Sequence, residues 1–194
     1  MARIAFIVAN DFEDAEFRVP YDEVKKAGHE AVIIGVEAGR QLKGKKGKEV
    51  ITAEKSVKDV REEDFAALVI PGGYSPDHLR MEIPMVGFVR DFFKADKPIA
   101  SICHGPWMLV EADIADGRTV TSFPSIKTDL INAGARWVDR EVVEDGGLIT
   151  SRKPDDLKAF CAALLRQVSQ GIAARLESPL APKATSDQQP SVHH

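Results

Sequence analysis

The sequence predicts an α/β fold in which a mostly parallel sheet carries helices on both faces. Short apolar runs recur along the chain, such as RIAFIVA at 3–9 and AALVI at 66–70, and such runs are typical of strands buried on both faces. Segments with helix signals separate these runs, and this alternation indicates parallel strands joined by helical crossovers. We expect a single domain over residues 1–170, followed by a C-terminal tail over 171–194 outside the core.

The first half of the chain continues from its first strand into a helix over about 13–27. This helix ends at Gly28, because glycine is frequent just past helix C-termini. A second buried strand, AVIIGV, covers 31–36. The polar stretch at 39–55 then carries a basic patch formed by Lys43, Lys45, Lys46 and Lys48. We interpret this stretch as a solvated hairpin rather than as a phosphate-binding loop.

The second half repeats the alternation. The strand at 66–70 leads directly into the turn Pro71-Gly72-Gly73. The later expected elements are a helix over about 84–95, a strand over 98–102, a helix starting just after Cys103, apolar pieces near 119–123, 136–143 and 147–151, and an amphipathic helix over about 154–168.

Composition and charge exclude several classes of protein. Apolar residues make up 44% of the chain and charged residues 29%, which is ordinary globular usage. A net charge of −4 gives no basic footprint, so we expect no nucleic-acid partner. No apolar run approaches the roughly 20 residues of a membrane span, so we expect no membrane insertion. The N-terminus lacks a signal-peptide pattern and the chain has only two cysteines, so we expect a cytoplasmic location.

Cys103 is the first candidate catalytic residue, because it stands between a buried strand and a helix in PIASICHGPW. Ligands of open α/β sheets bind at the carboxyl ends of strands, where this cysteine is expected to lie. A helix N-terminus and unpaired backbone N–H groups both favour a thiolate. The geometry therefore resembles a nucleophile elbow. Cys161 lies in the amphipathic run LKAFCAALL, and we expect it to be a packing residue of the core.

The histidines restrict the mechanism. No histidine lies between 105 and 192, which excludes a cysteine followed by a late histidine, as in triad-type amidotransferases. His104 and His78 remain as candidates near strand ends. The sequence contains neither C-x-x-C nor H-E-x-x-H, so we expect no metal and no cofactor.

Two further strand ends face the same edge of the predicted sheet. The glycine pair after the third strand offers backbone N–H groups suited to binding an oxyanion. Polar residues follow the first strand, and an acid near a thiolate would have a raised pKa and would donate a hydrogen bond as the neutral form. The candidates are Asn10, Asp11, Glu13 and Asp14. The residues alone leave open which of them points inward.

Four segments together resemble the ThiJ/PfpI superfamily, in particular its PfpI-type branch. They are NDFEDAEF, VIPGGYSPDHLR, KPIASICHGPWML and INAGARWVDREVVEDGGLITSRKPDDL. The resemblance covers about residues 2–168 in order. It implies a flavodoxin-like sandwich with Cys103 at a nucleophile elbow.

The resemblance also assigns roles to neighbouring residues. His104 matches the histidine beside the cysteine, and Glu13 matches the acid that binds the thiol. The backbones of Gly73 and His104 match the oxyanion donors. Asp77 stands where some members carry a glutamate that reaches the histidine from a neighbouring subunit, which implies a homodimer or larger homo-oligomer. Two residues depart from the pattern, because Asp77 is one methylene shorter than glutamate and Phe123 replaces a tyrosine.

The resemblance implies three possible activities. The first is a cysteine-dependent, deglycase- or glyoxalase-like enzyme of the stress response that acts on small reactive carbonyls or glycated substrates. The second is an intracellular cysteine peptidase, which needs a peptide groove and a well-oriented histidine. The third, without turnover, is a redox-responsive stress protein or chaperone. We expect the first, because a cysteine with a neighbouring acid suffices for addition to a carbonyl.

Overall fold

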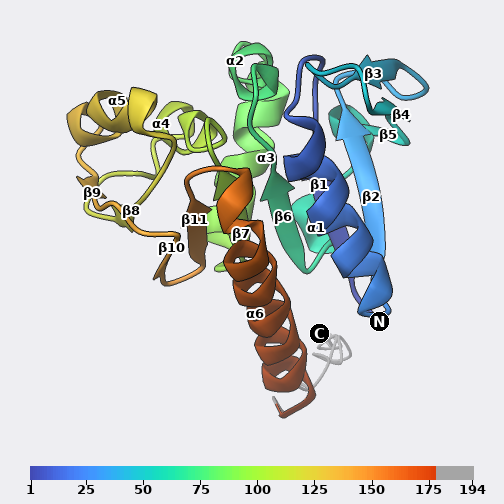
Figure 1. Cartoon of the computed structure of the whole chain (residues 1–194). Helices are drawn as coiled ribbons and strands as arrows, with labels where there is room; N and C mark the ends of the chain where they lie inside the picture. Colours follow the sequence, from blue (N-terminus) through green and yellow to red (C-terminus); the bar gives the residue numbers. More distant parts are fainter. Residues whose placement is uncertain (178–194) are drawn as a thin grey trace, which may run out of the picture.

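A computed structural model of the chain describes residues 1–177 and shows a seven-stranded central sheet with helices on both faces (Figure 1). The strands of this sheet are β1 (Arg3–Ile7), β2 (Glu30–Gly35), β5 (Lys55–Ser56), β6 (Ala67–Ile70), β7 (Ile99–Ile102), β10 (Val142–Asp145) and β11 (Leu148–Ser151). The helices are α1 (Asp14–Lys26), α2 (Ser75–Leu79), α3 (Ile83–Lys94), α4 (Trp107–Glu111), α5 (Lys127–Asn132) and α6 (Leu157–Glu177). Two small ladders join β3 (Gln41–Lys43) to β4 (Val50–Thr52) and β8 (Thr119–Val120) to β9 (Arg136–Trp137).

The sheet order is β10-β11-β7-β6-β1-β2-β5, and every neighbouring pair is parallel except the β10–β11 edge. The central strands β6 and β7 are buried along their whole length. Because β1 pairs with β2 on one side and β6 on the other, the order of the chain reverses beside β1, where ligand sites of open sheets occur. The predicted mostly parallel α/β fold is confirmed.

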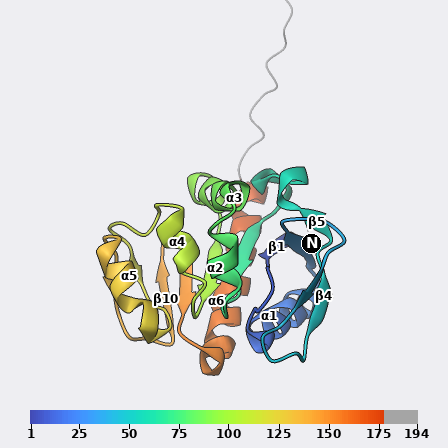
Figure 2. The same cartoon turned by 90° about the horizontal axis from the view of Figure 1, so that it is seen from above.

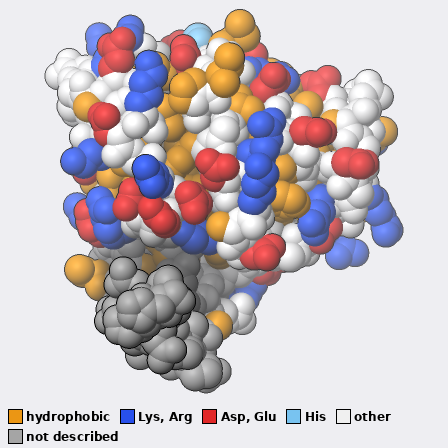
Figure 3. Space-filling model, turned by 180° about the vertical axis from the view of Figure 1, so that it is seen from behind, with side chains coloured by type: hydrophobic (Ala, Val, Ile, Leu, Met, Phe, Trp, Pro, Cys, Tyr) orange, Lys and Arg blue, Asp and Glu red, His pale blue; other side chains and the backbone are white. Residues whose placement is uncertain are grey.

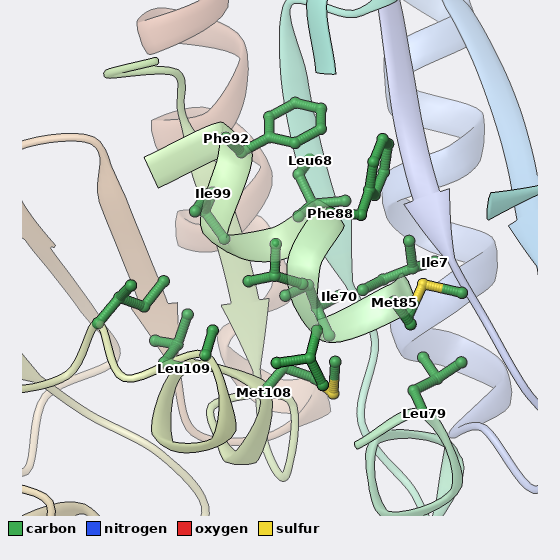
Figure 4. Packing of buried hydrophobic residues seen from close by; sticks show 14 of the residues in the cluster. Ile7, Leu68, Ile70, Leu79, Met85, Phe88, Phe92, Ile99, Met108 and Leu109 are labelled. Atoms are coloured by element: carbon green, nitrogen blue, oxygen red, sulfur yellow. The ribbon is translucent and has the colours of Figure 1, made fainter. Parts of the chain in front are cut away.

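One layer of helices packs on each face of the sheet (Figures 1 and 2). Helices α1 and α6 lie against one face, and α3 lies against the other beside α4. The core on the α3 face is built from apolar side chains of β1, β6 and β7 that meet α3 and α4 (Figure 4). Phe88 and Phe92 of α3 contact each other edge to face with ring centroids 5.0 Å apart. This packing fixes the strand ends that form the site.

Helix α1 covers the opposite face through a stripe of residues with helical spacing. Phe17, Pro20 and Val24 are buried on it, and Phe17 packs edge to face on Phe6 of β1 at 5.9 Å. Pro20 lies inside the helix, where its ring nitrogen donates no hydrogen bond to the Glu16 carbonyl one turn earlier. Glu16 also lies on this buried stripe.

The domain extends past the boundary expected at residue 170. Helix α6 runs without a break through Glu177, and Ile172 packs against the core on the α1 side. Residues 171–177 of the expected tail therefore continue this helix, and its remainder, 178–194, lies outside the described residues. Within residues 1–177, no helix is long and apolar enough to cross a membrane. Acidic and basic side chains alternate over the face seen from behind (Figure 3).

Candidate active site

Cys103 lies at a sharp turn where β7 ends. Its φ of 64° is in the left-handed region, which non-glycine residues rarely adopt. Its backbone N–H donates to the Ser151 carbonyl at 3.0 Å, and its carbonyl accepts from the Phe123 N–H at 2.9 Å. A Cβ on Gly105 would lie 2.6 Å from the Ile70 carbonyl oxygen, so only glycine lets the turn pass this close to β6. The elbow geometry expected from the sequence is therefore present.

The helix after this elbow differs from the expectation. Helix α4 begins only at Trp107 and has five residues, while residues 103–106 form turns. Cys103 therefore does not cap a helix, and the stabilisation of a thiolate by a helix dipole is not available in the expected form. Instead, the backbone N–H groups of Gly73 and His104 face the sulfur and favour its charged form. These are the two residues expected to supply oxyanion donors.

The glycine pair after β6 allows the turns to approach each other closely. A Cβ on Gly72 would lie 2.7 Å from the Cys103 Cβ and 2.5 Å from a carboxyl oxygen of Glu16. Gly73 has a φ of 74°, and a Cβ there would lie 2.3 Å from the Asp11 carbonyl oxygen. Both positions need glycine for the β1, β6 and β7 ends to meet.

Glu16, not Glu13, is the acid beside the thiol. Glu16 is 0% exposed, and its Oε2 accepts a hydrogen bond from the Gly72 N–H at 2.8 Å. Its carboxyl also contacts the Cys103 thiol, and each group shifts the pKa of the other. The assignment of Glu13 to this contact is wrong, because Glu13 precedes the helix in an extended conformation and directs its side chain elsewhere.

Glu13 binds the loop between β3 and β4. Its two carboxylate oxygens accept from Lys45 Nζ at 2.7 Å and Lys46 Nζ at 2.6 Å. Burial alone would raise the pKa of Glu13, but the hydrogen bonds and charges of the two lysines outweigh it and hold the pKa below its ordinary value. Asp14 accepts three backbone N–H groups of the same loop, from Lys46, Lys48 and Glu49. The predicted hairpin is present, and two of its lysines are bound at the site rather than only solvated.

Glu16 and Cys103 form a coupled pair. Burial raises the pKa of Glu16 to about 8, so its carboxyl is mostly protonated at pH 7. Burial, followed by the charge of Glu16, raises the pKa of the Cys103 thiol, and the N–H groups of Gly73 and His104 oppose this shift. The expected low pKa of Cys103 is therefore wrong in direction, since a buried thiol beside an acid resists ionisation. The pair carries at most one negative charge near neutral pH.

His104 lies over the thiol with both ring nitrogens engaged. Its Nδ1 is 3.2 Å from Cys103 Sγ, and its Nε2 is 3.0 Å from Ser125 Oγ. The ring stacks on Phe123 at 5.2 Å and meets the edge of Trp107 at 5.0 Å. Burial, with a smaller contribution from the charge of Lys45, lowers the pKa of His104. Ser125 was not foreseen from the sequence.

Asp77 does not meet His104 within the described part of one subunit. It is exposed on α2, and no hydrogen bond joins it to His104 among residues 1–177. His78 is also exposed and lies 3.3 Å from Asp11 Oδ2, so it does not join the thiol either. Large apolar side chains around α2 are exposed to solvent, with exposed fractions of 63% for Tyr74, 80% for Met81 and 86% for Ile83.

Cys161 lies in α6, where it is 4% exposed and packs within the core on the α1 side. The expectation that it is a packing residue is confirmed. Burial raises its pKa to about 12. Within residues 1–177, no group of three or more His, Cys, Asp and Glu side chains is arranged to hold a metal ion.

Comparison with known proteins decides the family. A family model described as the DJ-1/PfpI family matches residues 2–167. The chain belongs to the DJ-1/PfpI family. This confirms the resemblance inferred from the four segments and the flavodoxin-like sandwich that it implies.

Two curated DJ-1/PfpI relatives are similar over most of their length. "Protein/nucleic acid deglycase 2" of Escherichia coli K12 is 48% identical over 165 residues, which are 84% of this chain and 96% of that protein. "General stress protein 18" of Bacillus subtilis is 46% identical over 159 residues, which are 81% and 92% of the two chains. Among solved structures, a two-domain protein of Anabaena variabilis with DJ-1/ThiJ/PfpI-like and ferritin-like domains matches with a TM-score of 0.86 at 38% identity. That match covers 89% of this chain and half of the two-domain chain, 50%.

Proposed function

We propose that this DJ-1/PfpI protein is a deglycase-type enzyme of the stress response, and that Cys103 acts on reactive carbonyls or glycated adducts. One observation carries the proposal: the Cys103 thiol lies between the Glu16 carboxyl, the His104 ring at 3.2 Å and two backbone N–H groups. Two relatives that are 48% and 46% identical are named as a deglycase and as a general stress protein, and these names support the same activity.

The geometry supports addition of the thiol across a carbonyl group. The proton of the Cys103 thiol moves to His104 Nδ1, and the sulfur forms a bond to the carbonyl carbon. The π electrons of the carbonyl move to its oxygen, and the backbone N–H groups of Gly73 and His104 stabilise the charge that develops there. His104 then returns the proton to this oxygen, which leaves a hemithioacetal. No oxidant or second reactant is needed for this step.

The carboxyl of Glu16 stays neutral during this step. Because its pKa is raised to about 8, Glu16 remains protonated at pH 7 while the sulfur is transiently charged. A protonated carboxyl donates a hydrogen bond to the thiolate, whereas an ionised one would repel it. We also propose that the enzyme is cytoplasmic, because a reducing compartment keeps Cys103 as a free thiol. We further propose a homo-oligomer, supported by the exposed apolar side chains around α2.

A substrate panel tests the proposal. The full chain and Cys103→Ala are assayed with methylglyoxal, with methylglyoxal-modified amines and with a fluorogenic peptide. We expect turnover of the carbonyl compounds and a loss of at least about 100-fold in Cys103→Ala, since covalent catalysis depends on the nucleophile. Cys161→Ala, a substitution at the second buried cysteine, serves as the matched control and should retain turnover. Cleavage of the peptide without turnover of either carbonyl compound would instead favour a peptidase.

A further inference from the structure

We infer that Ser125 is the positioning residue for His104, and that it acts within one subunit by holding the Nε2 side of the imidazole ring. The inference rests on the proposed function of Cys103 and adds the residue that makes His104 a usable base. The decisive geometry is the 3.0 Å distance between Ser125 Oγ and His104 Nε2, opposite the 3.2 Å distance between Nδ1 and Cys103 Sγ. Both nitrogens of the ring are therefore occupied by side chains of the same subunit.

Ser125 is held in place although its side chain is exposed. It lies in the short 3-10 helix Pro124–Ile126, and Ile126 anchors this segment with only 1% exposure. The preceding Phe123 donates its N–H to the carbonyl of Cys103 at 2.9 Å, which ties the segment to the elbow. These contacts hold the backbone of Ser125 in a fixed position relative to the elbow, within reach of the His104 ring.

Aromatic packing alone cannot orient the imidazole. Phe123 stacks on the His104 ring with an angle of 24° between the planes, and Trp107 meets the ring at 68°. These contacts fix the plane of the ring. A rotation of the ring by 180° about its Cβ–Cγ bond keeps the same plane and leaves both contacts nearly unchanged. After such a rotation, a ring carbon would face the sulfur in place of Nδ1. The hydrogen bond to Ser125 distinguishes the two orientations, because only Nε2 can form it.

The hydroxyl also suits the proton transfer. When Nε2–H donates to Ser125 Oγ, the lone pair of Nδ1 faces Cys103 and can accept the thiol proton. The product is a thiolate beside an imidazolium whose two N–H groups donate to Cys103 Sγ and Ser125 Oγ. A carboxylate in place of Ser125 would raise the pKa of His104 and keep the ring charged at rest. A neutral hydroxyl leaves the ring uncharged, in accord with its lowered pKa.

This assignment competes with a carboxylate supplied by Asp77 of a second copy. Because Ser125 occupies Nε2 and Cys103 occupies Nδ1, an incoming carboxylate would have to displace one of them. The two alternatives therefore predict different sensitive residues. Ser125 should control the tautomer of His104 in the first case, and Asp77 in the second.

The test compares Ser125→Ala with the conservative Ser125→Thr in the full chain. Nitrogen-15 NMR of histidine-labelled protein reports the tautomer of His104, and iodoacetamide alkylation of Cys103 at pH 7 reports removal of the thiol proton. For Ser125→Ala we expect a mixture of tautomers, alkylation slowed about tenfold, and kcat for methylglyoxal lowered about tenfold with KM within about twofold. Ser125→Thr should restore all of these properties. Thr128→Ala, at an exposed hydroxyl on the neighbouring helix α5, is the matched control and should match the wild type.

Each outcome decides the inference. An unchanged tautomer and alkylation rate in Ser125→Ala overturn it, and so does a tautomer that responds to Asp77→Asn instead. A loss that Thr128→Ala shares or that Ser125→Thr does not restore also overturns it, since the effect would not depend on the hydroxyl at 125. A protein that turns over no carbonyl substrate, yet shows the Ser125-dependent tautomer and alkylation, supports the role of Ser125 and removes only the proposed function.

Discussion

Replacing Glu16 by glutamine should remove much of the pH dependence of stability between about pH 4.5 and pH 8. Glu16 is 0% exposed and its pKa is raised from 4.5 to about 8. In this window the folded protein retains a proton that the unfolded chain has lost. The contribution of Glu16 to stability is therefore fully present below pH 4.5 and is lost as pH rises through about 8. At about 1.4 kcal/mol for each pKa unit, the loss amounts to about 5 kcal/mol.

The assay is urea unfolding of wild type and Glu16→Gln at pH 4.5, 6, 7.5 and 9. Glutamine keeps an oxygen to accept the Gly72 N–H, which lies 2.8 Å from Glu16 Oε2, and it carries no titrating proton. We expect the free energy of unfolding of the wild type to fall relative to that of Glu16→Gln by about 5 kcal/mol over this range. Parallel pH profiles of the two proteins would refute the neutral-acid assignment on which the proposed chemistry depends.

Glu13→Gln provides a control of opposite sign. The pKa of Glu13 is lowered, because Lys45 and Lys46 outweigh the effect of burial. Its contribution to stability is present above the unfolded pKa of 4.5 and is lost as pH falls through the lower folded value. Glu13→Gln should therefore be less stable than wild type at neutral pH and approach it in acid. The same assay measures both variants.

Three further predictions concern the thiol, the elbow and the assembly. Cys103 should be alkylated faster than Cys161, and its rate of alkylation should rise between pH 7 and 9 rather than reach a plateau below pH 7. Iodoacetamide labelling with mass-spectrometric mapping measures both rates, and equal labelling of the two cysteines would contradict the prediction. Gly105→Ala places a Cβ 2.6 Å from the Ile70 carbonyl oxygen and should destabilise the protein by about 1–3 kcal/mol in urea unfolding. The control Gly87→Ala lies inside α3 and meets no atom within 4 Å, so it should stabilise the protein by up to about 1 kcal/mol. Light scattering at micromolar concentration should show at least a homodimer, and a monomer would refute the homo-oligomer.

Local patterns were sufficient to predict the fold. The apolar runs at 66–70 and 98–102 became the buried strands β6 and β7, because a strand buried on both faces needs apolar side chains throughout. The elbow at Cys103 followed from its place between such a strand and a helix. The glycines at 72 and 73 were expected to form a turn whose backbone N–H groups can bind an oxyanion, because glycine has no side chain to obstruct them.

The orientation of side chains around the thiol could not be predicted in the same way. The Lys45 contact to Glu13 and the Ser125 contact to His104 join residues that are 32 and 21 positions apart, and no local pattern encodes such a contact. One available signal was missed. Glu16 precedes Pro20 by one turn and Val24 by two, so helical spacing alone places this acid on the buried stripe of α1.

The two acids at the start of α1 lie one helical turn apart but differ in protonation state and in role. Glu13 and Glu16 are three residues apart and both are almost fully buried, at 3% and 0% exposure. Glu13 faces two lysines and is held ionised, so it fixes the loop over the site and cannot supply a proton at neutral pH. Glu16 faces a thiol and a single backbone N–H, so it is held protonated. Exchanging these surroundings would place a fixed negative charge beside Cys103, and addition to a carbonyl would then require a second negative charge in the same buried space.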